Sequence, residues 1–404
     1  MIVFEITFWV CVLAVFHSYV LYPILLRVFA IGKKQNTNCY QITDNNLPEV
    51  YIIFSAYNEE WVIQEKMESI FNTTYPLSKL HVHVGSDNSI DKTNQIIGRF
   101  TNQYPQLKFY PYTDRNGKSK ILNRLLAEIQ TQQIDTANTV FVFTDANVMF
   151  TPATIYELAK HFKNPAIGQV GSNILNRGVK EDGISYQEKS YIQRENSIKY
   201  LEGLNWGTMM GAFGACHAIR ANCWKDIPMN FLMEDFYLSM HVIRSKYKSI
   251  KELNAICYED VSNDIDEEFK RKTRIQAGNF QNLSVYWGLL FRFNAAAFCF
   301  LSHKVIRWLG PIFIILSYIT NLILVLTTCT CEFSGQFYLF TFVVQNLLLL
   351  TPLLDAVIKK TGLNIRLVRF VSYFYIMNLA LVKGFIMYIK GIKTNAWSPT
   401  KRNL

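Results

Sequence analysis

Three short polar clusters contain the residue types that could do chemistry. They lie at residues 56–60 (AYNEE), 86–91 (SDNSID) and 144–147 (TDAN), and each follows a short apolar, β-branched run. Carboxylates gathered in one place repel each other unless a cation or a donor-rich ligand lies among them. A divalent ion held by one or two carboxylates and by substrate phosphates fits such a cluster. Any one of these acids, taken alone, could instead cap the following helix.

The hydrophobic pattern around the clusters alternates between strand and helix. The strand-like runs cover 50–55, 80–85, 107–110 and 139–143, and helical periodicity covers 59–72, 91–104 and 117–130. This order predicts a mainly parallel sheet with helices on both faces. Such sheets bind ligands beyond the carboxyl ends of their strands, which is where all three clusters fall. The sequence has no GxxxxGK[ST] and no GxGxxG motif, which disfavours NTP hydrolysis and dinucleotide redox chemistry.

In their order along the chain, these clusters resemble the motifs of the membrane-embedded family 2 glycosyltransferases. That family includes bacterial cellulose, hyaluronan, chitin-oligosaccharide and poly-N-acetylglucosamine synthases. Residues 115–123 (RNGKSKILN), 211–220 (GAFGACHAIR) and 233–236 (MEDF) extend the resemblance. It implies an α/β GT-A (Rossmann-like) cytoplasmic domain over residues 36–283. It also implies an enzyme that moves a sugar, with inversion, from a UDP-sugar to a lipid-linked or growing saccharide acceptor.

The resemblance assigns a role to each matching residue. The catalytic base would be Asp235, with Glu234 beside it. The nucleotide would be bound by Ala56, Tyr57, Asn58, Glu60, Asp87, Lys118 and Asp145. The acceptor or the diphosphate would contact Gly211, Gly214, Arg271 and Arg274. The metal, Mg²⁺ or Mn²⁺, would be held by Asp145 and Asn147. Plainer roles stay open, since acids suit a helix start and arginines suit lipid headgroups.

The sequence departs from the family pattern at two places. Asn147 stands where the metal motif usually ends in Asp, so an ion would be held with one fewer negative charge. Residues 271–275 (RKTRI) lack the Gln and the Trp of the QxxRW motif found in processive members. In those members the Trp packs on the acceptor sugar, which Ile275 cannot do. Addition of one sugar is therefore favoured, and processive synthesis with secretion of the polymer, helped by export proteins, remains the alternative.

The composition indicates a membrane protein with a large polar domain. Of the 404 residues, 50% are hydrophobic and 18% are charged, against roughly 25% charged in soluble chains. We predict a multi-pass protein of a bacterial inner membrane, with the catalytic domain in the cytoplasm and a role in surface or exopolysaccharide synthesis. Its predicted segments are an anchor at 1–32, an interfacial amphipathic helix at 284–304, three membrane helices within 305–391 and a basic tail at 392–404.

The net charge of +10 does not indicate nucleic-acid binding. Much of the excess flanks the apolar segments, as positive-inside placement requires. The basic tail is the exception, because four full crossings would put it outside. Two further function classes lose support. Retention of Asp87, Asp145 and Asp235 argues against a catalytically silent scaffold, and the apolar segments hold few ionisable residues that could mark a transport path.

Overall fold

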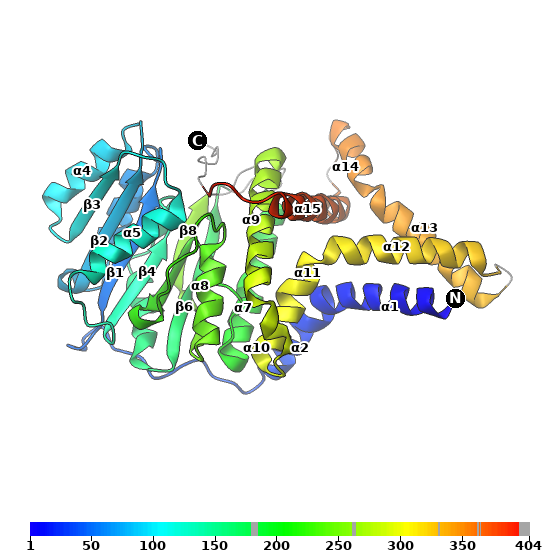
Figure 1. Cartoon of the computed structure of the whole chain (residues 1–404), viewed down its shortest axis with the longest axis horizontal. Helices are drawn as coiled ribbons and strands as arrows, with labels where there is room; N and C mark the ends of the chain where they lie inside the picture. The colour runs from blue at the N-terminus through cyan, green and yellow to red at the C-terminus, as the bar shows by residue number, and fades with distance from the viewer. Residues whose placement is uncertain (179–184, 261–263, 330–331, 362, 364, 396–404) are drawn as a thin grey trace.

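The computed structural model describes residues 1–178, 185–260, 264–329, 332–361, 363 and 365–395. An α/β domain forms one end of the molecule, and an arm of long helices extends from it (Figure 1). Most of the predicted basic tail, 396–404, lies outside the described residues.

The domain is built on one eight-stranded sheet in the order β3-β2-β1-β4-β7-β6-β8-β5. Its strands are β1 (Glu49–Ala56), β2 (Leu80–Asp87), β3 (Leu107–Tyr112), β4 (Thr139–Thr144), β5 (Val148–Phe150), β6 (Ile167–Arg177), β7 (Cys216–Arg220) and β8 (Lys248–Asp260). The first four strands are parallel, as predicted. The pairing is mixed in the rest of the sheet, because β6 runs parallel to β8, whereas β7 runs antiparallel to β4 and β6 and β5 runs antiparallel to β8. The start of β7 pairs with the end of β4, Cys216 with Thr144, so the chain enters β7 at the edge where the polar clusters lie.

Both faces of the sheet are buried under helices. Strand β1 shows why, because Val50, Ile52 and Phe54 enter one hydrophobic core while Tyr51 and Ile53 enter the other. The helices are α3 (Ile63–Phe71), α4 (Thr93–Gln103), α5 (Lys118–Gln130), α6 (Thr154–Ala159), α7 (Ser185–Trp206), α8 (Glu234–Arg244) and α9 (Ile265–Tyr286). Near-continuous apolar runs such as that of β1 are typical of strands buried on both faces.

The arm contains the helices that are apolar enough to cross a membrane. They are α1 (Ile2–Phe16) with α2 (Tyr22–Phe29), then α12 (Gly310–Thr327), α13 (Phe333–Leu349), α14 (Thr351–Lys360) and α15 (Arg366–Ile389). Among the described residues, three helices meet the length and hydropathy of a span, and the pair α13–α14, bent by 43°, would make a fourth. Helices α1 and α12 lie side by side (Figure 1), where Phe8, Leu324 and Tyr338 form a small core.

The predicted interfacial helix at 284–304 is wrong as a single helix. Helix α9 ends at Tyr286, a 3₁₀ turn follows over Trp287–Phe291, and α10 (Ala295–Cys299) leads into a π-helical turn and α11 (Ile306–Trp308). The break arises because the Asn294 side chain caps α10, accepting from the Ala297 amide at 2.9 Å. The aromatic side chains of the broken segment are nevertheless exposed, namely Trp287, Phe291 and Phe293.

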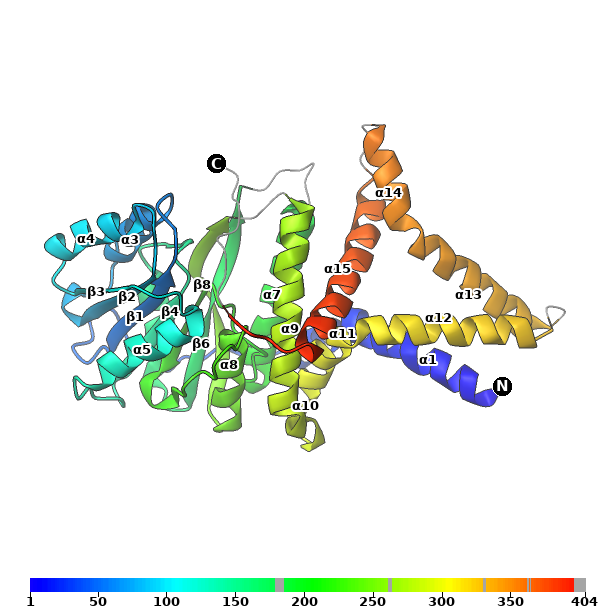
Figure 2. The same cartoon turned by 45° about the horizontal axis from the view of Figure 1, so that its top comes forward.

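Helix α15 does not extend away with the rest of the arm. It packs along α9 and runs back to the domain (Figure 2). Gly384 permits this close packing, since a Cβ there would lie 2.7 Å from the Thr273 carbonyl oxygen. Beyond α15, the buried Asn395 donates its amide to the Phe231 carbonyl oxygen at 3.5 Å. The described chain therefore ends against the α/β domain.

The return of α15 to the α/β domain predicts a membrane topology that labelling can check. In intact cells, a membrane-impermeant maleimide is expected to label the exposed Cys329, at the far end of α12. An epitope tag at the C-terminus is expected to be reached by antibody only after permeabilisation. Because Cys331 lies two residues further along the chain, the double variant Cys329→Ser/Cys331→Ser provides the labelling control. Antibody access to the tag in intact cells would instead make α15 a full crossing.

Candidate active site

Lys118 brings three of the predicted motifs together. It is the first residue of α5, directly after Gly117, whose φ of +79° turns the chain into the helix. Its Nζ lies 2.6 Å from Oδ1 of Asp145 and 2.6 Å from Oε1 of Glu234. Burial disfavours the charged amine, but the two carboxylates outweigh it and raise the pKa of Lys118. The site therefore contains a fixed cation between the end of β4 and the start of α8.

Asp235 lies in the first turn of α8 and is only 6% exposed. Its Oδ1 accepts a hydrogen bond from the Phe236 amide at 2.7 Å. Burial and the neighbouring charge of Glu234 raise the pKa of Asp235 to about 6. A carboxylate with such a pKa is ionised at neutral pH and still basic enough to take a proton, which suits a general base.

The loop at 211–214 lies directly against this carboxylate. Gly211 has φ of +77°, and a Cβ there would meet the Phe236 ring at 2.4 Å. A Cβ on Gly214 would lie 3.0 Å from Oδ2 of Asp235. Glycine at both positions lets the loop pass this close to Phe236 and Asp235. Its contact with an acceptor stays a prediction.

Asp87 holds the turn that carries Lys118. Its side chain is fully buried, its Oδ1 accepts from the Asn116 amide at 2.6 Å, and its Oδ2 accepts from the Gly117 amide and Arg115 Nη1 at 2.9 Å each. The Arg115 guanidinium lies 3.2 Å from the centroid of the Tyr57 ring. The sequence had not singled out Arg115, although its place in the RNGK run was a signal. Direct contact of Asp87 with the nucleotide stays a prediction.

The other residues of the first cluster brace the loops at the ends of β1 and β2. Ala56 is buried at the end of β1. Asn58, with φ of +51°, accepts from the Ile90 amide at 2.9 Å. Glu60 accepts from the Lys92 amide at 3.1 Å. These contacts give the three residues a structural role, and their predicted contact with the nucleotide remains untested.

The two arginines of α9 differ in their surroundings. Arg271 pairs with Glu268 at 3.4 Å, and that carboxylate raises the pKa of the guanidinium. Arg274 has no such pair among the described residues, and burial lowers its pKa against the opposing charges of Glu234 and Asp145. Arg274 is thus a second cation near the two carboxylates that Lys118 joins, and it is available to a diphosphate.

Asp145 and Asn147 suit a divalent ion whose remaining ligands come from the substrate and water. The Asp145 side chain is 34% exposed and is paired with Lys118 through Oδ1. Among the described residues, no group of three or more His, Cys, Asp or Glu could hold an ion. The protein would therefore supply one carboxylate and one amide oxygen. Diphosphate oxygens and water would supply the rest, as is usual for Mg²⁺.

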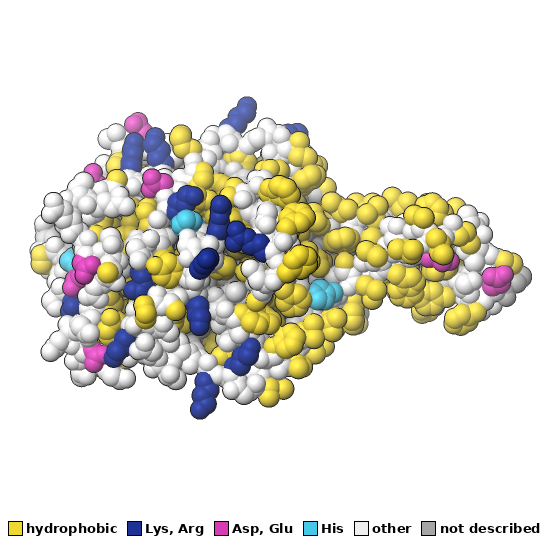
Figure 3. Space-filling view, turned by 60° about the horizontal axis from the view of Figure 1, so that its bottom comes forward, with side chains coloured by type: hydrophobic (Ala, Val, Ile, Leu, Met, Phe, Trp, Pro, Cys, Tyr) yellow, Lys and Arg dark blue, Asp and Glu magenta, His cyan; other side chains and the backbone are white. Residues whose placement is uncertain are grey.

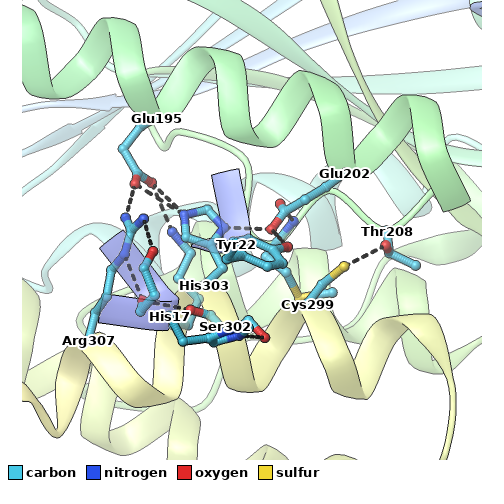
Figure 4. A network of polar contacts seen from close by, with 12 residues as sticks. His17, Tyr22, Glu195, Glu202, Thr208, Cys299, Ser302, His303 and Arg307 are labelled. Atoms are coloured by element: carbon cyan, nitrogen blue, oxygen red, sulfur yellow. Dashed lines mark hydrogen bonds and ion pairs between the residues drawn. The ribbon is translucent and has the colours of Figure 1, made fainter. Parts of the chain in front are cut away.

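A buried polar network that the sequence did not predict supports the loop from the arm (Figure 4). His303 is fully buried between two carboxylates, with Nδ1 2.7 Å from Glu202 Oε1 and Nε2 3.0 Å from Glu195 Oε2. Arg307 also donates to Glu195, at 2.6 Å. These ionisable residues lie far apart in sequence. The only signal in the sequence was the regular spacing of the glutamates Glu188, Glu195 and Glu202 on α7, which places them on one side of that helix.

Glu202 connects this network to the loop at 211–214. Its Oε1 accepts from the Tyr22 hydroxyl at 2.7 Å, and its Oε2 accepts from the Met210 amide at 2.9 Å. Met210 directly precedes Gly211, so one carboxylate of α7 ties α2 to the loop beside Asp235. Buried polar groups that are fully paired in this way define a single arrangement of the chain.

We expect Glu202→Gln to lower stability and turnover together. The amide cannot accept from all three partners, and breaking a buried ionic contact costs about 3 kcal/mol. A shifted loop is expected to lower kcat on the order of tenfold, with the donor KM unchanged. Thermal unfolding and steady-state kinetics check this, with Glu68→Gln on the exposed face of α3 as control. Unchanged kcat in a destabilised variant would limit Glu202 to a role in stability.

Part of the chain is similar to known proteins. Residues 51–223 match the model of glycosyl transferase family 2. A probable glycosyltransferase, YdaM of Bacillus subtilis, is 36% identical over 85 residues, which are 20% of each chain. A β-monoglucosyldiacylglycerol synthase of Synechocystis sp. is 26% identical over 249 residues, 59% of this chain and 50% of the relative. The chain thus spans half or less of the length of these curated relatives.

The fold also recurs in a solved structure over nearly the whole chain. The mannosyltransferase PcManGT of Pyrobaculum calidifontis, in complex with GDP-Man and Mn²⁺, superposes with a TM-score of 0.67 at 18% identity. The match covers 96% of this chain and 99% of that one. Residues 51–223, with the strands and loops that surround Lys118, therefore belong to a family 2 glycosyltransferase domain with the GT-A fold.

Proposed function

We propose that the chain transfers one sugar, with inversion, from a nucleoside diphosphate sugar to a hydroxyl of a lipid at the membrane surface. The observation that carries this proposal is the pairing of Lys118 with both Asp145 and Glu234 at 2.6 Å, next to the buried Asp235. It combines a cation for the leaving diphosphate with a carboxylate of suitable pKa for the acceptor hydroxyl.

A lipid acceptor is favoured by two observations. Three helices are long and apolar enough to span a membrane, so the domain would be held at its surface. A relative over more than half of this chain is named as a glucosyldiacylglycerol synthase. Polymer synthesis with export partners is the second version, and Ile275, in place of the sugar-stacking Trp, disfavours it.

In the proposed reaction the acceptor oxygen forms a bond to the anomeric carbon, and the bond from that carbon to the diphosphate breaks. Asp235 takes the hydroxyl proton, and Lys118 and Arg274 offset the negative charge that develops on the leaving diphosphate. Asp145 and Asn147 would hold a Mg²⁺ or Mn²⁺ ion, which supplies further charge compensation when bound. The loop at 211–214 would direct the acceptor towards Asp235.

The test uses the full chain reconstituted in lipid nanodiscs with labelled UDP- and GDP-sugars. We expect one labelled glycolipid from one donor class, formed with Mg²⁺ or Mn²⁺ and lost with EDTA. Products carrying many sugars would support polymer synthesis instead. No product with any donor or lipid, from protein that binds a nucleoside diphosphate, would contradict the lipid acceptor.

A further inference from the structure

A cavity lies outside the residues assigned to catalysis. It has a volume of about 380 Å³ and lies between the residues that follow α2, the end of α7 and the starts of β6 and β8. None of its lining residues belongs to the predicted site. The lining residues that matter here are Lys34, Asn36, Tyr200, Asn205, Trp206 and Lys248.

The cavity carries positive charge without compensation. Among the described residues that line it, Lys34, Lys248 and Lys251 are basic and none is Asp or Glu. Burial lowers the pKa of Lys251 well below its ordinary value, so the positive charge comes from Lys34 and Lys248. Lys34 and Lys248 are exposed, and no described carboxylate pairs with either of them. The stem of Lys248 packs on Gly207, where a Cβ would lie 2.7 Å from its Cγ. Lys and Arg side chains gather on this face, close to the hydrophobic arm (Figure 3).

One lining residue, Asn205, also has a buried hydrogen-bond acceptor without a described partner. Asn205 is 8% exposed, and its amide nitrogen donates to the Leu26 carbonyl oxygen at 2.9 Å. Its Oδ1 has no hydrogen-bond partner among the described residues. A buried acceptor left in this state is costly. A ligand with an anionic group and a hydroxyl would satisfy both the lysines and this oxygen.

The position of the cavity identifies where such a ligand comes from. Lys34 follows the apolar span Ile2–Phe29 by five residues, so it lies where a chain leaves the hydrocarbon. Trp206, also in the lining, packs edge-on against Phe298 of α10, with ring centroids 6.1 Å apart. The turn before α10 exposes Trp287 and Phe293, which are residue types that favour the membrane interface.

We propose that this cavity binds the headgroup of an anionic phospholipid, with the phosphate between Lys34 and Lys248 and a headgroup hydroxyl on Asn205. Basic pockets beside membrane helices bind acidic headgroups in this way. The volume of the cavity is within the usual range for a small-ligand site. The inference needs α1–α2 to be inserted in the bilayer, but it does not depend on sugar transfer.

The test measures lipid retention without any sugar donor. The purified full chain is titrated with phosphatidylglycerol or phosphatidylcholine, and bound lipid is counted by native mass spectrometry. The double variant Lys34→Gln/Lys248→Gln is expected to bind phosphatidylglycerol about thirtyfold more weakly. The variant Lys34→Arg/Lys248→Arg is expected to retain it, since both charges stay. The control Lys108→Gln/Lys120→Gln removes two exposed lysines from the β3 and α5 end of the domain, far from the arm (Figure 1).

Three outcomes would overturn the proposal. Equal losses of phosphatidylglycerol binding in the double variant and in the control would show that the lipid responds only to the overall charge of the surface. Equal binding of phosphatidylcholine and phosphatidylglycerol would remove the role of the lysines. Displacement of the lipid by an equal concentration of glycerol 1-phosphate would assign the cavity to a soluble phosphate compound. Because no transfer is measured, each result stands whether or not the proposed reaction is correct.

Discussion

Replacing Asp235 with Asn is expected to reduce sugar transfer by about a thousandfold while leaving nucleoside diphosphate affinity unchanged. The amide matches the carboxylate in size and can still accept from the Phe236 amide, so the start of α8 is preserved. It cannot take a proton from the acceptor hydroxyl. Steady-state kinetics and calorimetric titration with the diphosphate separate the two effects. Normal turnover in the variant would remove Asp235 as the base.

The same residue predicts a pH dependence with a definite sign. Because the pKa of Asp235 is raised to about 6, transfer by the unmodified chain should rise as the pH increases through that value. A folded-state pKa above the ordinary 3.8 also means that the folded state binds the extra proton. This contribution to stability is present at low pH and is lost as the pH rises towards about 6. The stability of Asp235→Asn, measured by thermal unfolding, should lack that loss between low pH and about pH 6. If the pKa of Asp235 were ordinary, the variant and the unmodified chain would show the same dependence of stability on pH over this range.

Replacing Lys118 with Met is expected to weaken donor binding about a hundredfold, because a charge-assisted contact to the diphosphate is lost. The change also leaves Asp145 and Glu234 facing the same gap without the cation that lies 2.6 Å from each. Both carboxylates would then repel the incoming diphosphate. Titration with UDP and GDP in the presence of Mg²⁺ measures the loss directly.

Lys120 provides the matched control, since it is two residues further along α5 and exposed. Lys120→Met removes the same charge from the same helix without touching either carboxylate. Donor affinity should be within twofold of the unmodified chain, as is usual for a surface change that costs less than about 0.5 kcal/mol. Equal losses in the two variants would show that Lys118 acts only through the overall charge of the helix.

The sequence alone predicted the class of fold and the residues that meet in the site. Apolar runs at 50–55 and 139–143, each ending in polar residues, predicted parallel strands, because a strand buried on both faces must be apolar throughout. The acids at 234 and 235 left a helix start open as their plainer role, and α8 begins at Glu234. These features depend on local pattern, which a single chain displays.

Other features could not be predicted because they join residues that are distant in sequence. The second half of the sheet mixes antiparallel and parallel pairs, because β7 starts beside the end of β4 while β6 and β8 run parallel, which no local pattern shows. Helix α15 has the hydropathy of a span, yet it packs on α9, and only the absence of a side chain at Gly384 allows that approach.

The sequence and the tertiary structure determine different aspects of the charged residues. The sequence determined that carboxylates and lysines were present, and motif order showed which of them would gather at the edge of the sheet. Only the tertiary structure decided their partners. It joined Lys118 to Asp145 and Glu234, buried His303 between two glutamates more than 100 residues away, and left Lys34 and Lys248 unpaired beside the arm. The reason is physical, since charge interactions depend on distance and burial, and folding sets both.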